Sequence, residues 1–449
     1  MLSSRGERCT APSLPYWGAF ARALADPYSA TLNPTGAIPL CVAENKLPEP
    51  HALLTARLAA PRILLSGVLG YDDMRGRTSL RNAFAALATR RLTGGARVDP
   101  THLTIAAGCG ALIAALASTL LDDGDAVLLP TPTYGALYND FTVLAGVKVV
   151  DVPRPIGADK IPGTGALDSV TLDAALDGAR ARGLRVRALF IINPDNPTGA
   201  VIPRAAMQTQ IKWAREHNLH VIVDEIYALS EWGNKIEEEI HSFTSAAALL
   251  AAANPNPASL YLGDDVHVLW GFSKDFAASG LRTGVLFSHN QRLNDSLSNI
   301  GYFMTVANDT QDILASIVAD DAWIDVFLNA NHAALQRAHA SVVDVLSTLR
   351  IPFARATSGM FVWFSLREFF DIIDDVGKNE EEDRDHQVAA ERAINEALWF
   401  EQKLVFTPGE ACHATESGWF RICFAWPHEE GALQEALRRL GVFVAKRRR

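Results

Sequence analysis

The sequence predicts an α/β protein in which helices cover both faces of a mostly parallel sheet. From about residue 51 to about residue 310, short apolar runs alternate with helical stretches rich in Ala and Leu. Continuous apolar strands that alternate with helices are typical of a buried parallel sheet. These apolar runs occupy residues 126–129, 186–192, 220–223, 266–270 and 284–287.

Polar or glycine-rich segments follow most of these runs. They are Pro130–Tyr134, Asn193–Asn196, Asp224–Tyr227 and the pair Ser273 and Lys274. Ligands of open α/β sheets bind beyond the carboxyl ends of the strands. We therefore expect the functional site to lie where these segments meet.

Three segments are expected along the chain. Residues 1–50, rich in Pro, Tyr and Trp, indicate an irregular arm that contributes to a smaller domain. Residues 51–310 form the large domain, and residues 311–449 form the smaller α+β domain. The latter begins with a helical stretch at 323–349, which leads into a strand-like run at 358–364.

Composition narrows the class of protein. The chain has 449 residues, 49% of them hydrophobic, and a formal net charge of −10, which argues against nucleic-acid binding as the main function. It has no apolar run of about 18 residues and no signal-peptide core near Met1. Its five scattered cysteines lack CxxC spacing. We therefore expect a cytoplasmic protein with no membrane, nucleic-acid or metal partner.

Lys274 is the most informative residue, because it directly follows an apolar run. Desolvation disfavours a buried ammonium, so a lysine held there tends to have a lowered pKa, and a neutral amine can form a Schiff base. Arg282 offers a cation nearby, and Asp224 ends another apolar run. A lysine, an arginine and an aspartate are what a pyridoxal phosphate (PLP) site needs, although Asp224 is also suited to a helix N-cap.

Three further residues fit such a site, each with a structural alternative. Tyr227 is placed to hydrogen-bond the cofactor's ring oxygen, or it is a satisfied buried tyrosine. Asn196 lies in the rigid turn Asn193–Gly199, which either presents its amide to the cofactor or is only a tight turn. Tyr134 either stacks on the cofactor ring or packs in the core.

Two features suggest anion binding. Gly108-Cys109-Gly110 precedes a helical stretch, and small residues at a helix N-terminus let backbone N–H groups reach a phosphate; a plain loop is the alternative. Arg421 lies in an apolar strand-like run, where its guanidinium suits a substrate α-carboxylate. A structural ion pair with a carboxylate is the alternative for Arg421.

Together these residues resemble fold-type I PLP enzymes of the class I/II aminotransferase superfamily. The resemblance rests on the order and spacing of Asn196, Asp224, Tyr227, Lys274, Arg282 and Arg421, and it runs from about Tyr16 to Ala425. Residues 43–47, 408–413 and 418–425 resemble segments of 1-aminocyclopropane-1-carboxylate (ACC) synthases. The segment 267–276 is similar to that of fungal ACC-synthase-like proteins, which include C–S lyases.

The resemblance implies a role for each residue. Lys274 is the Schiff-base lysine and proton carrier, and Asp224 pairs with the ring nitrogen. Asn196 and Tyr227 bind the ring oxygen, and Tyr134 stacks on the ring. The phosphate is held by Arg282, Ser273 and the amides of Cys109 and Gly110. The substrate is bound by Arg421, by Tyr16 and by Glu44, for which a simple helix or loop role is the alternative. The family also implies a homodimer whose sites are completed by the partner chain.

Three positions depart from the family pattern. Met74 stands where ACC synthases and aspartate aminotransferases carry a tyrosine that reaches the partner's site. Gly271 replaces a serine, and Gly110 replaces a threonine. The phosphate would thus lose hydroxyl donors. Tyr71, in the same segment as Met74, is a candidate substitute.

We expect a PLP-dependent enzyme that deprotonates Cα of a sulfur-containing amino acid and cleaves or substitutes a C–S bond. Aminotransferase, true ACC synthase acting on S-adenosylmethionine, and a non-catalytic PLP-binding protein are the alternatives. The missing hydroxyls count against ring-closing ACC synthesis more than against Cα deprotonation. The substrate is expected to be a small amino acid.

Overall fold

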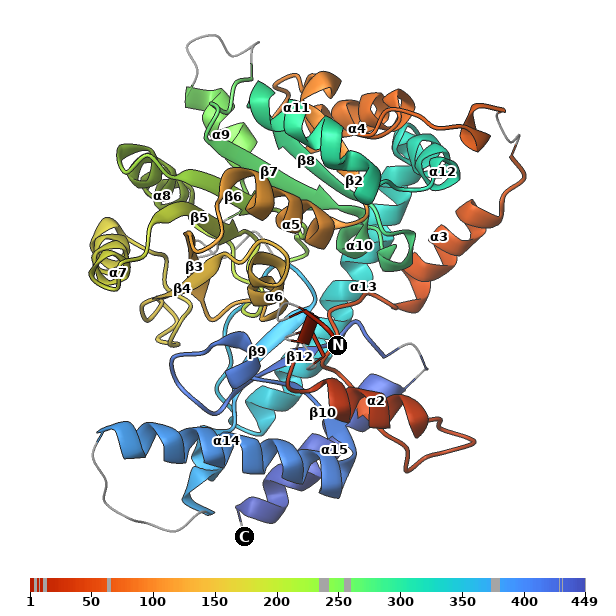
Figure 1. Ribbon diagram of the computed structural model, residues 1–449. Helices are drawn as coiled ribbons and strands as arrows, with labels where there is room; N and C mark the ends of the chain where they lie inside the picture. Colours follow the sequence, from red (N-terminus) through yellow and green to blue (C-terminus); the bar gives the residue numbers. More distant parts are fainter. Residues whose placement is uncertain are drawn as a thin grey trace.

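A seven-stranded sheet forms the centre of the larger body of the protein (Figure 1). The computed structural model describes residues 1–3, 6–7, 9–10, 14–62, 66–233, 242–253, 260–372, 380–427, 429 and 431–448. The strand order is β2-β8-β7-β6-β5-β3-β4, and only β8 runs antiparallel to its neighbours. The strands are β2 (Leu103–Ala106), β3 (Ala126–Thr131), β4 (Lys148–Pro153), β5 (Val186–Ile192), β6 (His220–Asp224), β7 (Val266–Gly271) and β8 (Gly284–Ser288).

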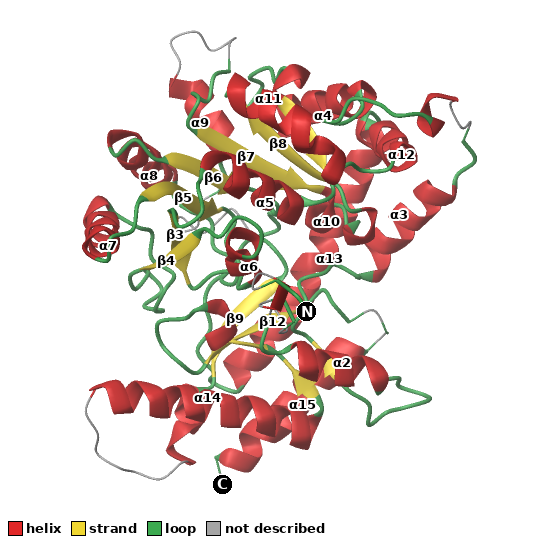
Figure 2. Ribbon diagram, in the orientation of Figure 1, coloured by secondary structure: helices red, strands yellow, loops and turns green. Residues whose placement is uncertain are grey.

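Helices pack on both faces of this sheet (Figure 2). One face carries α4 (Thr78–Arg91), α7 (Ser169–Ala181), α8 (Arg204–Glu216), α9 (Ala246–Ala253) and α12 (Asn308–Val318). The other carries α5 (Cys109–Leu120), α6 (Ala136–Thr142) and α11 (Gln291–Ile300). Leu189 and Phe190, adjacent in β5, lie in opposite cores, because successive side chains of a strand point to opposite faces. The predicted parallel sheet covered on both faces is therefore confirmed.

Side-chain caps explain where several helices begin. Asp168 accepts a hydrogen bond from Thr171 N (2.8 Å) at the start of α7. Asn290 accepts from Leu293 N (3.0 Å) at the start of α11. Such caps satisfy backbone donors that have no partner inside the helix.

A second body, below the large sheet in Figure 1, is built from short strands and long helices. Its three-stranded sheet has the order β11 (Thr407–Pro408), β12 (Trp419–Cys423) and β9 (Phe361–Ser365). A parallel pair joins β1 (Ile38–Pro39) to β10 (Leu404–Val405). The surrounding helices are α2 (Trp17–Ala25), α14 (Glu380–Gln402) and α15 (Ala432–Arg447).

The helix α13 (Asp321–Thr348) joins the two bodies. Its 28 residues span about 42 Å. Phe327 near its start belongs to the core of the large sheet, whereas Leu335 and Val342 belong to the core of the second body. A continuous helix whose two halves pack in different cores restricts how the two bodies can sit relative to each other. The short α3 (Pro48–Ala59) packs beside it, and α10 (Phe272–Asp275) follows β7.

The structure corrects some details of the sequence prediction. β2 and β4 were not among the predicted runs, and β3, β6, β7 and β8 extend beyond them. The N-terminal arm is not wholly irregular, because α2 buries Phe20 and Ala23 in the second body's core. The domain limits at residues 50 and 310 stay a prediction. Among the described residues, no helix combines the length and apolarity that crossing a membrane requires.

Candidate active site at the carboxyl edge of the sheet

The ends of β3, β5, β6 and β7, which we call the carboxyl edge, gather most of the predicted site residues. Asp224 is the last residue of β6, and Lys274 lies in α10 directly after β7. Asn196 follows β5, and Arg421 reaches it from β12 of the second body, with Arg421 Nη1 donating to Asn196 Oδ1 (2.8 Å). The site therefore lies between the two bodies of the protein.

Lys274 is held on a rigid support. Its Nζ donates to the carbonyl oxygen of Ala43, and burial lowers its pKa. The neighbouring Asp275 is fully buried and fixes α10, since its carboxylate accepts from Trp270 Nε1 (2.8 Å) and Ser230 Oγ (2.6 Å). The site thus favours a neutral amine at a fixed position.

Asp224 is a buried carboxylate with an unusual pKa. Burial raises its pKa to about 7, although Ile226 N, which donates to its Oδ1 (3.1 Å), and the nearby Lys274 both oppose the shift. Residues 226–229 form a turn, so the predicted alternative of a helix N-cap is wrong. A cationic ring nitrogen beside this carboxyl would favour its ionised form.

The three tyrosines of the predicted site differ in burial. Tyr227 is buried, and its ring lies edge-on to Phe361. Tyr16 is buried as well, close enough to Arg421 for the guanidinium to oppose the rise in its pKa that burial causes. Tyr134 is 36% exposed, so the alternative that it packs in the core is wrong.

Arg421 is 1% exposed. Its Nη2 donates to Cys41 O (2.5 Å) and Thr407 Oγ1 (3.0 Å), and its guanidinium lies over the Phe361 ring. No ion pair joins it to a carboxylate of the described residues, so the alternative of a structural ion pair is wrong. Arg421 Nε is buried without a hydrogen-bond partner among those residues. A buried cation with an unused donor suits an anionic ligand.

A cradle for an anion lies at the start of α5. Gly108, just before the helix, has φ +92°, and a Cβ there would lie 2.7 Å from Arg282 Nη2. Arg282 itself adopts a left-handed conformation (φ +47°), and its Nη1 donates to Ser279 O (3.0 Å). The glycine therefore lets the guanidinium approach the helix N-terminus, where backbone N–H groups attract anions.

The other predicted phosphate ligands surround this cradle. Ser273 is buried in α10. The thiol of Cys109 points away, donating to Trp270 O (3.4 Å), so only its backbone N–H faces the cradle. A Cβ at Gly271 would lie 3.0 Å from Cys109 Sγ, which leaves little room for the serine that relatives are expected to carry.

Glu44 lies close to the site but already has partners in the protein. It forms an ion pair with Lys46 (3.1 Å) and accepts from Ser279 Oγ. The ammonium of Lys46 also lies over the Trp426 ring (3.3 Å). The structure thus brings Glu44 to the rim of the site, and its contact with substrate stays a prediction.

Sequence reasoning missed Asp140 on α6. A Cβ at Gly110 would lie 3.6 Å from Asp140 Oδ1, so this carboxyl lies beside the cradle. Burial raises its pKa to about 7. No sequence motif points to Asp140, because this residue belongs to none of the recognised segments. It comes near the cradle only because α6 packs on α5.

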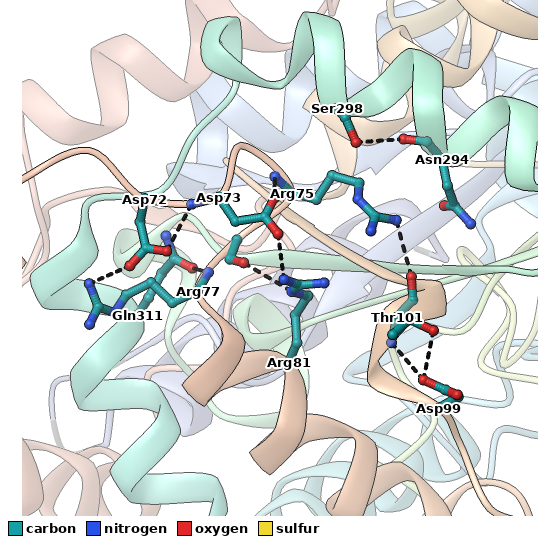
Figure 3. A network of polar contacts seen from close by, with 11 residues as sticks. Asp72, Asp73, Arg75, Arg77, Arg81, Asp99, Thr101, Asn294, Ser298 and Gln311 are labelled. Atoms are coloured by element: carbon teal, nitrogen blue, oxygen red, sulfur yellow. Dashed lines mark hydrogen bonds and ion pairs between the residues drawn. The ribbon is translucent and has the colours of Figure 1, made fainter.

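The segment around Met74 is held by charged contacts (Figure 3). Arg77 pairs with Asp72 (2.8 Å), and Arg81 pairs with Asp73 (2.5 Å). Tyr71, immediately before them, is fully exposed. Tyr71 therefore contacts no part of its own chain's site, and a role for its hydroxyl would require a partner chain.

The residues present fit PLP. A glycine-bounded helix N-terminus with Arg282 suits the phosphate, and the buried Asp224 suits a cationic ring nitrogen. The buried Arg421, with its unpartnered Nε, suits the carboxylate of an amino-acid substrate. No cluster of three or more metal-ligating side chains occurs in the described part of the chain.

Comparison with known proteins identifies the family. The family model "Aminotransferase class I and II" matches residues 35–440. The chain is 32% identical to the mouse "Probable inactive 1-aminocyclopropane-1-carboxylate synthase-like protein 2" over 90% of its own length, and spans 65% of that protein. It is 31% identical to rice 1-aminocyclopropane-1-carboxylate synthase 4, covering 96% of this chain and 86% of the rice protein.

Solved structures share the fold. The aspartate aminotransferase of Thermus thermophilus, solved with maleate, has a TM-score of 0.74 at 20% identity and covers 98% of this chain and 99% of its own. The aromatic aminotransferase of Pyrococcus horikoshii has a TM-score of 0.72 at 21% identity, covering 96% and 99%. The chain therefore belongs to the class I and II aminotransferase family of PLP-dependent, fold-type I proteins, with ACC synthases and ACC-synthase-like proteins among its relatives.

Proposed function

We propose that the chain is a PLP-dependent enzyme that removes the Cα proton of a sulfur-containing amino acid and cleaves or substitutes a C–S bond. The observation that carries this proposal is the buried Lys274, which lies near the carboxyl of Asp224 and whose pKa is lowered by burial. The relatives named ACC synthase support chemistry at a sulfur-containing amino acid.

The cofactor would be held at two ends. The amides of Cys109 and Gly110, the hydroxyl of Ser273 and the guanidinium of Arg282 would bind the phosphate. At the other end, Asp224 would pair with the ring nitrogen, Asn196 and Tyr227 would donate to the ring oxygen, and Tyr134 would cover the ring. When bound, PLP supplies an electron sink for negative charge at Cα.

Asn196 is well oriented for this role. Its Oδ1 already accepts from Arg421 Nη1. The amide nitrogen is then the atom left to donate to a ligand. The same hydrogen bond ties the ring-binding amide to the arginine that would bind the substrate.

Lys274 would carry the proton. Only a neutral amine can accept a proton from Cα, and burial, which lowers the pKa of Lys274, favours that form. Arg421 would orient the substrate by its carboxylate, using donors that include the unpartnered Nε. Tyr16 and Glu44 would contact the rest of the substrate.

Two other activities share this site. The family model favours aminotransfer, and the names of the curated relatives favour ACC synthesis. A non-catalytic PLP-binding protein is the third alternative, favoured by the name of the mouse relative. The presence of Lys274 argues against it.

Product analysis separates these activities. The protein, loaded with PLP, would be incubated with an S-alkyl-cysteine or with S-adenosylmethionine, with and without a 2-oxo acid acceptor. Cleavage of a β-thioether consumes one water and releases a thiol, ammonia and a 2-oxo acid without any acceptor. Turnover only with an acceptor would identify an aminotransferase, and ACC from S-adenosylmethionine an ACC synthase.

We also propose that the protein forms a homodimer. Leu69, Tyr71, Tyr302 and Phe303 are from 58% to 100% exposed. The two segments that carry them are adjacent, because Gly301 packs against the backbone of Met74. Adjacent exposed aromatic and aliphatic side chains suit a protein interface. The cytoplasmic location stays a prediction.

Light scattering tests the dimer. Tyr71→Asp should shift the protein toward the monomer mass, and a Tyr261→Asp variant, at an exposed tyrosine outside these two segments, should not. A wild-type protein that is monomeric at micromolar concentration would refute the proposal.

A further inference from the structure

Arg154, directly after β4, is a buried arginine that none of the sequence motifs includes. Its side chain is 8% exposed. Its Nη1 forms an ion pair with Asp195 Oδ1 (2.9 Å), and its Nη2 donates to the carbonyl oxygen of Pro132. Arg154 N also donates to Thr131 O (2.9 Å). One residue thus contacts two separate loops at the carboxyl edge.

The first of these loops carries Asn196. Asp195, its neighbour, has a 4% exposed side chain and accepts from Thr198 N (3.2 Å) and Thr198 Oγ1 (2.5 Å). The carboxylate of Asp195 therefore closes the turn on one side and pairs with Arg154 on the other. Asn196 in turn accepts from Arg421.

The second loop carries Tyr134. Pro132, which accepts from Arg154, lies two residues before Tyr134, and Thr133 N donates to Cys412 O of the second body (2.8 Å). Thr133, Arg154 and Asp195 line one cavity. The guanidinium of Arg154 connects the Pro132 loop to the Asp195 loop beside this cavity.

We infer that Arg154 is a positioning residue that sets the distance between Tyr134 and Asn196, and thereby aligns the cofactor ring and Arg421. This inference rests on the proposed PLP site, but not on the lyase activity. Removing the guanidinium would leave Asp195 buried without its cation and free the two loops to separate. Misplacement of about 1 Å in such a site can lower activity about a hundredfold.

The test compares Arg154→Met, Arg154→Lys, Asp195→Asn and the double variant Arg154→Met/Asp195→Asn. We expect Arg154→Met to raise the dissociation constant of PLP, measured by quenching of tryptophan fluorescence in the apoprotein, about tenfold. Arg154→Lys should recover only part of this loss, because a lysine cannot reach Asp195 and Pro132 together. The double variant should bind PLP no worse than Arg154→Met alone.

Arg439→Met is the matched control. Arg439 is a buried arginine far from the site, donating to Gly36 O (2.7 Å) and Gln402 O (3.1 Å) and pairing with Glu435 (2.7 Å). We expect it to lower the melting temperature of the apoprotein as Arg154→Met does, but to leave the PLP dissociation constant unchanged.

Wild-type PLP affinity in both Arg154→Met and Asp195→Asn would overturn the inference. Should Arg154→Met not fold, Asp195→Asn and Arg154→Lys decide it by the same readout. Wild-type protein that binds PLP but releases no thiol would refute the lyase proposal and leave the affinity test of Arg154 intact. Wild-type protein that does not bind PLP would refute both.

Discussion

Both edges of the seven-stranded sheet bury titratable side chains, but the hydrogen-bond partners of these side chains differ between the edges. At the amino edge, where His220 begins β6 and Ser288 ends β8, His220 Nδ1 and His267 Nε2 are hydrogen-bonded (3.2 Å), and His267 Nδ1 bonds Ser288 Oγ (2.8 Å). The ring of His267 has both nitrogens paired inside the protein. Burial lowers its pKa to about 3.

At the carboxyl edge, several polar groups lack such partners. Among the described residues, the buried Arg421 Nε, Thr131 Oγ1 and Asn193 Nδ2 have no hydrogen-bond partner. The carboxyl of Asp224 accepts one backbone bond, and its pKa is raised to about 7. Unpaired buried polar groups cost stability unless something else pairs them. The comparison indicates that His267 at the amino edge is satisfied within the protein, whereas Arg421 and Asn193 at the carboxyl edge keep donors for a ligand.

The largest expected effect is at the carboxyl edge. Lys274→Ala should lower amino-acid turnover by about a thousandfold to ten-thousandfold, because it removes the proton carrier. Steady-state product release measures this effect. Lys46→Ala, at the ion-paired lysine near the rim, is the control and should keep most of the turnover. Comparable loss in both variants would contradict the role of Lys274.

Asp224→Asn should show how much the ionisation of this buried carboxyl lowers the unfolding free energy of the apoprotein. The folded-state pKa of about 7 lies above the ordinary value of 3.8, so the unfolded chain releases its proton first. The contribution of Asp224 to wild-type stability is therefore lost as pH rises from about 4 to about 7, and this loss is absent in the variant. The difference in unfolding free energy between the two proteins should change by roughly 2 to 4 kcal/mol across this range.

Urea unfolding at pH 4 and pH 8 measures this difference. Asp177→Asn, at an exposed carboxylate, should show no such change. If the difference in unfolding free energy between wild type and Asp224→Asn is the same at both pH values, folding does not raise the pKa of Asp224. The carboxyl would then be ionised at neutral pH without a ligand.

Arg421→Lys should lower kcat/KM about a hundredfold, with the larger part in KM. A lysine keeps the charge but cannot donate to Asn196, Cys41 and a carboxylate in the same planar arrangement. Arg439→Lys, at the buried arginine remote from the site, controls for lost stability. An unchanged KM would exclude Arg421 as the carboxylate ligand.

The smallest expected effect tests the amino edge. The folded-state pKa of His267, about 3, lies below its ordinary value of 6.5, so the unfolded chain takes up the proton first as pH falls. The contribution of His267 to wild-type stability should therefore decline from pH 6.5 downward, and His267→Gln should remove this decline, which amounts to about 2 kcal/mol at pH 5. PLP affinity should not change. His51→Gln, at an exposed histidine, is the control. A change in PLP affinity in His267→Gln would contradict the view that the amino edge takes no part in binding the cofactor.

Much of the fold and the site followed from local patterns. Apolar runs located β5 and β7, because a strand buried on both faces is apolar at most of its positions. β4 was missed because its residues Lys148, Asp151 and Pro153 are exposed at the sheet's edge, which breaks the apolar run. The recognised motifs also led to Lys274, Asp224 and Arg421, which the structure brings together.

The sequence by itself determined which residues end the strands and so which side chains reach the carboxyl edge. Only the tertiary structure decided their partners. The Arg421–Asn196 hydrogen bond joins residues 225 positions apart, and Lys274 meets the carbonyl of Ala43 across 231 positions. The contacts of Arg154 with Asp195 and Pro132 likewise depend on the order of the strands in the sheet. Periodicity reports which side chains are buried, but hydrogen bonds between distant segments depend on how the sheet and the second body pack together, which no local pattern encodes.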